Sequence, residues 1–232
     1  LGGSTGTVNL ITGGTIITPV VVKSGGPSAT FNFDGGVLRA RGSGATLPSF
    51  MQGLSAASVK AGGAVIDSGN NVITVAQNLQ SGALPDGGLT KRGAGMLTLS
   101  GTNSYNGLTT VEAGTLRLGC AAAVTNGGDV TVSGGCYDLG GFAVTNGTVT
   151  LTSGAIISGA LSAGAFALSE GVVQADLKGD GGLTKTGAGT LTLGGTSHAY
   201  AGGTRVEGGT LRVGVLPEHR WSFNGNWKDS IG

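Results

Sequence analysis

The strongest constraint on this chain is that it repeats itself at a fixed distance. The stretch GGLTKRGAGMLTLSGTNSYNGLTTVEAGTLRLG, from Gly87 to Gly119, returns as GGLTKTGAGTLTLGGTSHAYAGGTRVEGGTLRVG from Gly181 to Gly214, with one extra residue near His198. The starts of the two copies lie 94 residues apart. Self-similarity at a fixed period is typical of repeat architectures, in which each unit stacks on copies of itself.

A shorter period lies within each copy. The strand-like phrase around Leu97 returns around Leu116, and the phrase around Leu191 returns at nearly the same interval around Leu211. Side chains alternate between the two faces of a strand, so the leucines point to one side and the residues between them to the other. A strand phrase that recurs about every twenty residues is typical of one coil of a parallel β-solenoid.

We therefore predict an all-β fold, a right-handed parallel β-helix over about residues 1–215. The predicted core contains Leu97, Leu99, Leu116, Leu118, Leu191, Leu193 and Leu211. Further strands are expected where alternating apolar residues lie between glycines, at Thr7–Ile11, Thr15–Val22, Ala29–Phe33, Val37–Ala40, Ala64–Asp67, Asn71–Ala76, Asp129–Ser133, Tyr137–Leu139, Ala143–Thr145, Thr148–Thr152, Ala155–Ile157 and Ala165–Ser169. The stretch Leu47–Leu54, which contains Pro48, predicts a short loop or one helical turn lying over the solenoid.

The two long copies also resemble a known family. The phrase GGLTKTGAGTLTL followed by GTLRVG, and its earlier twin, are similar to the autotransporter-associated β-strand repeat of bacterial passenger regions. Segments such as FNFDGGVLRA and GGAVIDSGNNVITVAQNLQ are similar to the sequence between such repeats, so the resemblance covers residues 30–214. It implies export and a secreted or bacterial cell-surface location, associated with the outer membrane in the parent protein. The family is defined by a structural repeat and offers no catalytic residue to carry over.

Composition agrees with a β-rich chain that turns often. Glycine supplies 49 of 232 residues, whereas only 11% are charged and 39% are apolar. Glycine destabilises helices, and the Val, Ile and Thr between the glycines favour strands. The rival fold is a tandem of β-sandwiches, since 94 residues is close to one such domain. The twenty-residue recurrence and an aromatic content of 5% favour the solenoid.

Charge and hydropathy exclude several classes of protein. The 13 basic and 12 acidic residues give a net charge near +1 with no basic stripe, so no nucleic-acid partner is expected. The longest apolar stretch, Ile16–Val22, contains Pro19 and is far too short to cross a bilayer. The chain begins at Leu1 without a methionine or a recognisable leader, so we expect an excerpt of a longer polypeptide.

Cysteine and histidine give little support for a redox or metal site. The separation of Cys120 and Cys136 along the chain is close to one coil but falls short of it. They are either a disulfide, which an oxidising compartment would permit, a reactive pair, or two small buried residues in unrelated coils. The histidines are His198 and His219, and no Cys/His cluster occurs, so neither a metal nor a cofactor is expected.

Solenoids also include polysaccharide lyases and hydrolases, which need carboxylates close together. The acids here are scattered singly: Asp34, Asp67, Asp86, Glu112, Asp129, Asp138, Glu170, Asp176, Asp180, Glu207, Glu218 and Asp229. Glu112 and Glu207 occupy equivalent places in the two copies, as do Asp86 and Asp180, which indicates structural roles. We predict no catalytic, cofactor-binding or metal-binding residue, and keep a polysaccharide-active enzyme as the alternative. Thr148, Thr150 and Thr152 with Thr190 and Thr192 could form a flat hydroxyl array, or the exposed faces of ordinary strands.

The last stretch of the chain differs from the rest. Residues 216–232 predict a linker, broken at Pro217, and the truncated start of a second domain. His219–Gly232, with Trp221 and Phe223, resembles the opening strand of laminin-G-type, concanavalin-A-like jelly rolls. The chain is thus interpreted as a non-catalytic stalk that presents an adjacent adhesive or carbohydrate-binding module. Its partners would be carbohydrate or a host or cell-surface protein, bound through that module.

Overall fold

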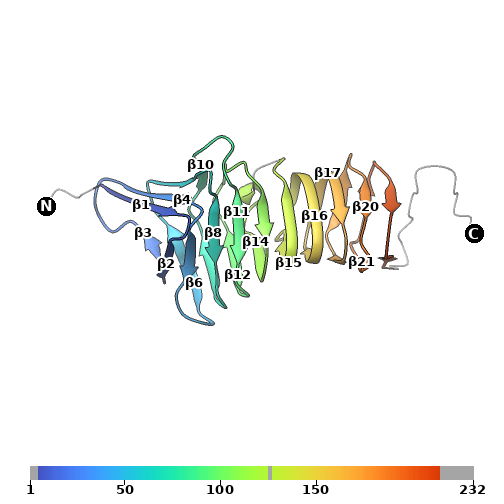
Figure 1. Cartoon of the computed structure of the whole chain (residues 1–232), viewed down its shortest axis with the longest axis horizontal. Coiled ribbons are helices and arrows are strands. Elements are labelled where there is room, and N and C mark those ends of the chain that lie inside the picture. The colour runs from blue at the N-terminus through green and yellow to red at the C-terminus, as the bar shows by residue number, and fades with distance from the viewer. Residues whose placement is uncertain (1–4, 125–126, 215–232) are drawn as a thin grey trace, which may run out of the picture.

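The computed structural model describes residues 5–124 and 127–214. Within these residues the chain forms 24 strands, β1–β24, and a single 3-10 turn, η1 (Ala121–Ala123). The strands wind into about ten coils that stack along the long axis of the molecule, from the blue N-terminal end to the red C-terminal end (Figure 1). The pairings between strands are parallel, which excludes antiparallel β-sandwiches and confirms the predicted parallel β-solenoid.

Two columns of stacked strands run through the whole solenoid. Column B contains β2 (Thr15–Thr18), β5 (Val37–Ala40), β8 (Ala64–Asp67), β11 (Leu89–Arg92), β13 (Thr109–Val111), the start of β15 (Val130–Asp138), the middle of β16 (Ala143–Ile157), the end of β17 (Ala160–Leu168), β20 (Leu183–Lys185) and β23 (Thr204–Val206). Column C contains β3 (Val21–Val22), β6 (Thr46–Gln52), β9 (Val72–Val75), β12 (Met96–Leu99), β14 (Thr115–Leu118), the ends of β15 and β16, β18 (Gly171–Val173), β21 (Thr190–Leu193) and β24 (Thr210–Val213).

The third face of the solenoid is formed by strands in two separate sections. Column A contains β1 (Gly6–Ile11), β4 (Ala29–Asp34), β7 (Ala56–Val59) and β10 (Leu79–Ser81). Column D contains the starts of β16 and β17 with β19 (Asp176–Gly179) and β22 (Ala199–Tyr200). Between the two sections the chain passes through η1. Asn103 bridges this interruption, because its Oδ1 accepts from the Leu79 N–H at 2.8 Å and its Nδ2 donates to the Ala123 carbonyl at 2.6 Å.

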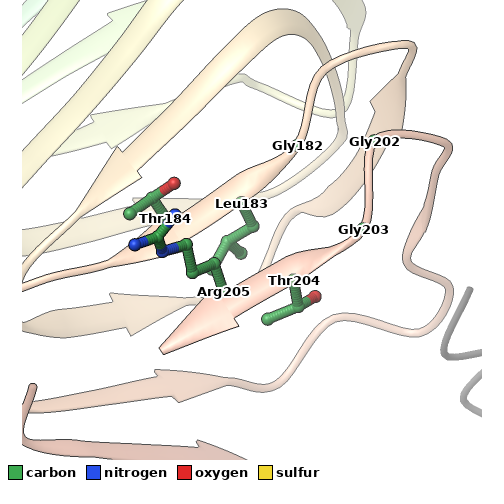
Figure 2. Close-up of a pocket in the computed structure, with 7 residues that line it drawn as sticks. All are labelled: Gly182, Leu183, Thr184, Gly202, Gly203, Thr204 and Arg205. Carbon is green, nitrogen blue, oxygen red and sulfur yellow. The ribbon is translucent and has the colours of Figure 1, made fainter. Parts of the chain in front are cut away.

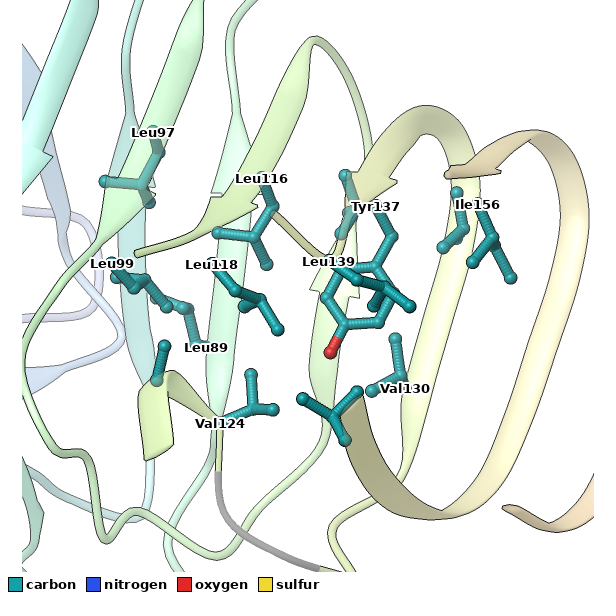
Figure 3. Close-up of a cluster of buried hydrophobic side chains, with 14 of the residues drawn as sticks. Leu89, Leu97, Leu99, Leu116, Leu118, Val124, Val130, Tyr137, Leu139 and Ile156 are labelled. Carbon is teal, nitrogen blue, oxygen red and sulfur yellow. The ribbon is translucent and has the colours of Figure 1, made fainter. Parts of the chain in front are cut away.

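The core is a continuous apolar column inside the coils. Leu97 stacks in register on Ile73 and Leu116, so equivalent side chains meet from coil to coil (Figure 3). Of the predicted core leucines, Leu97, Leu99, Leu116, Leu118, Leu191 and Leu193 are at most 1% exposed. Leu211 is only partly buried, because among the described residues β24 has a stacked partner, β21, on one side.

The stretch Leu47–Leu54 corrects one prediction. It contains the strand β6 instead of a loop or helical turn, and Phe50 and Met51 are fully buried. Leu47 pairs with Ile73 and Met51 with Val75, so the register shifts between them. Pro48 falls in this bulge, where a residue without an N–H does not interrupt a regular ladder.

Other strand boundaries also differ from the sequence prediction. The strands expected at Asp129–Ser133 and Tyr137–Leu139 form one continuous strand, β15, and the three expected between Ala143 and Ile157 form β16. These strands pass round a corner of the coil while still pairing with their neighbours. Strand β7 was not predicted, because its alanines and serine carry little strand preference.

Candidate functional site

The two sequence copies form equivalent pairs of coils. The first copy supplies β11–β14, in which Leu89–Lys91 pairs with Thr109–Val111. The second supplies β20–β24, in which Leu183–Lys185 pairs with Thr204–Val206. Five parallel steps along column B separate β11 from β20, so the 94-residue offset corresponds to five coils. The side chains at a given position of the first copy can therefore be compared directly with those at the equivalent position of the second.

Each copy buries a lysine in the solenoid core. Lys91 is fully buried in column B, and its Nζ donates to the carbonyls of Arg92 at 2.8 Å, Gly93 at 2.7 Å and Ala113 at 3.0 Å. Ala113 belongs to the next coil, so the ammonium joins two successive coils. Burial lowers the pKa of Lys91 to about 8, with the negative charge of Asp67 opposing the shift.

Lys185 makes the same arrangement in the second copy. It is also fully buried, and its Nζ donates to the carbonyls of Thr186, Gly187 and Gly208, the last two at 2.9 Å. The sequence analysis did not identify these two equivalent lysines as buried residues. The available signal was that each lysine lies two residues after an inward leucine, in both copies. We call each lysine with its three carbonyls a lysine cage; its chemistry is structural, because all three ammonium donors are used by the backbone.

A tyrosine and a threonine form a second shared device. The Tyr105 hydroxyl lies 2.9 Å from Thr109 Oγ1 inside the core, and Tyr200 makes the equivalent hydrogen bond to Thr204. Burial raises the pKa of Tyr105 to about 12, although the hydrogen bond to Thr109 opposes the shift. Each copy therefore holds this corner with a lysine cage and a tyrosine–threonine hydrogen bond, which is buried in the first copy and partly buried in the second.

In the first copy, both carboxylates that were predicted to be structural are held by hydrogen bonds or by an ion pair. Asp86 is buried and accepts from the N–H groups of Gly88 at 3.0 Å, Asn106 at 2.8 Å and Gly107 at 2.7 Å. Its equivalent Asp180 is exposed instead. The second carboxylate of each copy forms an ion pair.

These ion pairs are not identical in the two copies. Glu112 forms its ion pair with Arg92 of the adjacent coil, at 2.7 Å. Glu207 forms its ion pair with Arg205 of the same coil, at 2.8 Å. Asp67 pairs in register with both Arg92 and Arg39, and its carboxylate lies 3.5 Å from the Arg39 guanidinium. Opposite charges therefore alternate along column B from Arg92 toward the N-terminal end.

Most remaining acids bind backbone N–H groups at turns. Asp34, Asp67, Asp129 and Asp138 accept from Gly62, Gly69, Thr148 and Gly140 respectively. Burial alone would raise the pKa of Asp176, but hydrogen bonds from Ser197 and Thr196 and the charge of His198 lower it below its usual value. Across residues 5–124 and 127–214, no three His, Cys, Asp or Glu side chains gather as a metal site would require.

The two cysteines are free thiols, so the disulfide alternative is wrong. Cys136 pairs with Thr115 at the start of β14, whereas Cys120 follows the end of that strand. The length of β14 alone is about 10 Å, at about 3.3 Å per residue, which is beyond the reach of a disulfide. Burial and the nearby Asp138 raise the pKa of the Cys136 thiol.

The threonines named as a possible hydroxyl array lie on two different faces. Thr150 belongs to column B and Thr192 to column C, so the set does not form one surface. Column B instead carries an outward-facing series of one residue per coil, five threonines and one alanine, which pair in register. The series is Thr90, Thr110, Thr131, Thr150, Ala167 and Thr184, and we call it the threonine column.

A surface hollow of about 460 Å³ lies where the threonine column meets the last two described coils. Its lining is Gly182, Leu183, Thr184, Gly202, Gly203, Thr204 and Arg205 (Figure 2). The Arg205 side chain extends beside Thr184, its in-register neighbour, and its guanidinium lies next to the threonine. Sequence reasoning did not identify this hollow.

Comparison with known proteins gives a match for the two sequence copies. Residues 89–118 and 183–213 match a family model described as Passenger-associated-transport-repeat. Both copies are similar to this transport repeat. The chain is also 36% identical over 142 residues to the Adhesin BmaC autotransporter of Brucella suis biovar 1 (strain 1330). That alignment covers 57% of this chain and 4% of the Brucella protein, so the chain spans a small part of its relative. No solved structure gives a significant match.

The transport repeats and the adhesin relative support a secreted or cell-surface location, as the sequence resemblance predicted. None of the helical structure in the described part of the chain is long and apolar enough to cross a membrane. The repeat matches end at residue 213. The laminin-G-type module expected from His219–Gly232 lies outside the described residues and has no support from the comparisons, so it stays a prediction.

Proposed function

We propose that this chain is a non-catalytic passenger segment that acts as a rigid spacer at the bacterial surface. The observation that carries the proposal is the unbroken parallel stacking from β2 to β23 in column B and from β3 to β24 in column C. Each coil adds about 4.8 Å to the axis, so about ten coils span roughly 48 Å. The adhesin relative and the transport repeats support a role in display.

In the finer form of this proposal, the spacer holds an adjacent adhesive or carbohydrate-binding module away from the cell. Carbohydrate or a surface protein would then be bound by that module. A polysaccharide-active enzyme is the alternative class of function. The acids described above support the spacer over the enzyme, because Asp86, Glu112 and Glu207 are held by backbone N–H groups or by arginines.

The test measures how far the chain holds an epitope from the membrane. The chain is placed between a surface anchor and an epitope, and the height of the epitope above the membrane is measured by fluorescence quenching. Deleting residues 92–185 removes 94 residues, Lys185 included, and joins Lys91 to Thr186; this corresponds to five coils. The expected result is a height lower by about 24 Å with unchanged display.

A control deletion of 104 residues, 92–195, removes the same coils but joins column B to a position outside it. It should disrupt the stack and reduce display. Equal display and height for the two deletions would contradict the spacer. Release of new reducing ends from polysaccharides by the purified chain would favour the enzyme.

A further inference from the structure

The two copies differ at one corner, and in the second copy this corner lines the hollow. In the first copy Leu108 stands next to Thr109 and its side chain is 44% exposed at the surface. In the second copy the equivalent residue before Thr204 is Gly203, which has a φ of +75° and, among the described residues, no atom within 4 Å of where a Cβ would lie. Gly203 thus lines the hollow without a side chain, where the first copy carries a half-exposed leucine.

The arginine of the repeat lies at a different position in the second copy, because Arg92 of the first copy is replaced by Thr186. Thr110 of the first copy is replaced by Arg205, which pairs in register with Thr184. Glu207 holds the Nε of Arg205 at 2.8 Å, and 77% of the arginine side chain is exposed. Anchoring through Nε orients the guanidinium and leaves its Nη edge beside Thr184 at the hollow (Figure 2). Such a guanidinium edge matches the two oxygens of a carboxylate.

A neutral hydroxyl surface leads away from the hollow. The threonine column places a hydroxyl or a small side chain in each coil from Thr184 back to Thr90, at a spacing of about 4.8 Å. No charged residue interrupts this column between these two positions. Hydroxyl groups both donate and accept hydrogen bonds, so the surface suits a ligand that is itself rich in hydroxyls.

We propose that the hollow binds an acidic saccharide, with its carboxylate on Arg205 and its hydroxyls on Thr184 and the threonine column. A peptide that binds through apolar side-chain pockets is less well matched, because Leu183, the apolar side chain in the lining, is 1% exposed. The inference deepens the proposed surface role and rests on it, since a saccharide ligand would be met outside the cell.

The test uses the whole purified chain and polygalacturonate oligomers as the probe, with binding followed by calorimetry. Arg205→Thr copies the residue of the first copy and should fold normally; it is expected to weaken binding at least tenfold. Arg205→Lys keeps the charge without the planar fork and should also weaken binding. Arg212→Thr, an exposed arginine of the same coil on column C, is the matched control and should leave affinity unchanged.

Three outcomes would overturn the inference. They are no binding of the oligomers, equal loss in Arg205→Thr and Arg212→Thr, and equal binding of oligomers whose carboxylates have been reduced to alcohols. Tighter binding of poly-glutamate than of polygalacturonate would replace the saccharide with an acidic peptide. None of these results changes the measured reach of the spacer, so failure of this inference is distinguishable from failure of the proposed function.

Discussion

Replacing Lys91 by methionine tests whether the lysine cage holds neighbouring coils together. Methionine fills a similar space but donates no hydrogen bond. The Arg92 carbonyl keeps a second donor, the Ser68 N–H at 3.0 Å, so we count only the carbonyls of Gly93 and Ala113. A buried acceptor left without a donor costs about 1 to 3 kcal/mol. Because these two hydrogen bonds are partly buried, we take the lower end of that range for each and predict a loss of about 2 kcal/mol.

The loss should be local, because each coil of a solenoid contacts only its neighbours. Amide hydrogen exchange measures it at the Glu112 and Thr115 N–H groups, which bond to the preceding coil. A loss of about 2 kcal/mol corresponds to exchange about 30-fold faster. The Glu207 N–H, bonded to the Lys185 carbonyl at 2.8 Å, is the internal control and should be unchanged.

The reciprocal variant Lys185→Met should reverse the pattern. Unchanged exchange at Glu112 in Lys91→Met would show that the carbonyls gain other donors, and the cage argument would fail. Equal acceleration at Glu112 and Glu207 would show that the stack opens as one unit, against the nearest-neighbour reasoning.

Three further predictions concern the polar core, the corners and the thiols. Tyr105 keeps its proton to a pH of about 12 in the folded chain, whereas an unfolded tyrosine loses it near pH 10. The free energy of unfolding should therefore fall as the pH rises from about 10 to 12. Chemical denaturation of Tyr105→Phe should show a smaller fall. Gly114 has a φ of +65° and a Cβ there would lie 2.2 Å from a backbone oxygen, so Gly114→Ala should cost about 2 to 5 kcal/mol, against about 1 to 2 kcal/mol for the control Gly25→Ala, which has a similar φ and open space; equal melting temperatures would refute this. Alkylation of Cys136, followed by mass spectrometry, should need a higher pH than an ordinary thiol because burial and Asp138 raise its pKa, and an ordinary profile would contradict the burial.

The stacked fold was predictable because its information is local and repeated. Alternation around Leu97 and Leu116 gives the inward face, and recurrence gives the coil, without knowledge of distant contacts. The irregular stretch around Pro48 was not predictable, because whether a bulge is tolerated depends on the strand with which β6 pairs. Coil lengths also vary, since the coil from Leu151 to its stacked partner Leu168 is shorter than the coil that contains this bulge.

The candidate site was less predictable than the fold. Alternation alone places Lys91 beside Leu89 in the core, yet a lysine charge argues against burial. The backbone carbonyls that accept from Lys91 are invisible in a pattern of side chains. The hollow brings Gly182 and Thr184 together with Gly203 and Arg205 of the next coil, and the sequence alone does not show that these residues line one surface hollow.

The match between the two copies has a consequence for how such a protein changes over generations. Lys91 and Lys185 occupy the same column and the same inward position, five coils apart. Misaligned recombination between the similar DNA segments that encode the copies would remove or duplicate a whole number of coils. The new junction would reproduce the phrase GGLTK followed by TGAG or RGAG, so the strands of columns B and C would again meet partners in register. A gene of this kind can lengthen or shorten its product by whole coils in a single event.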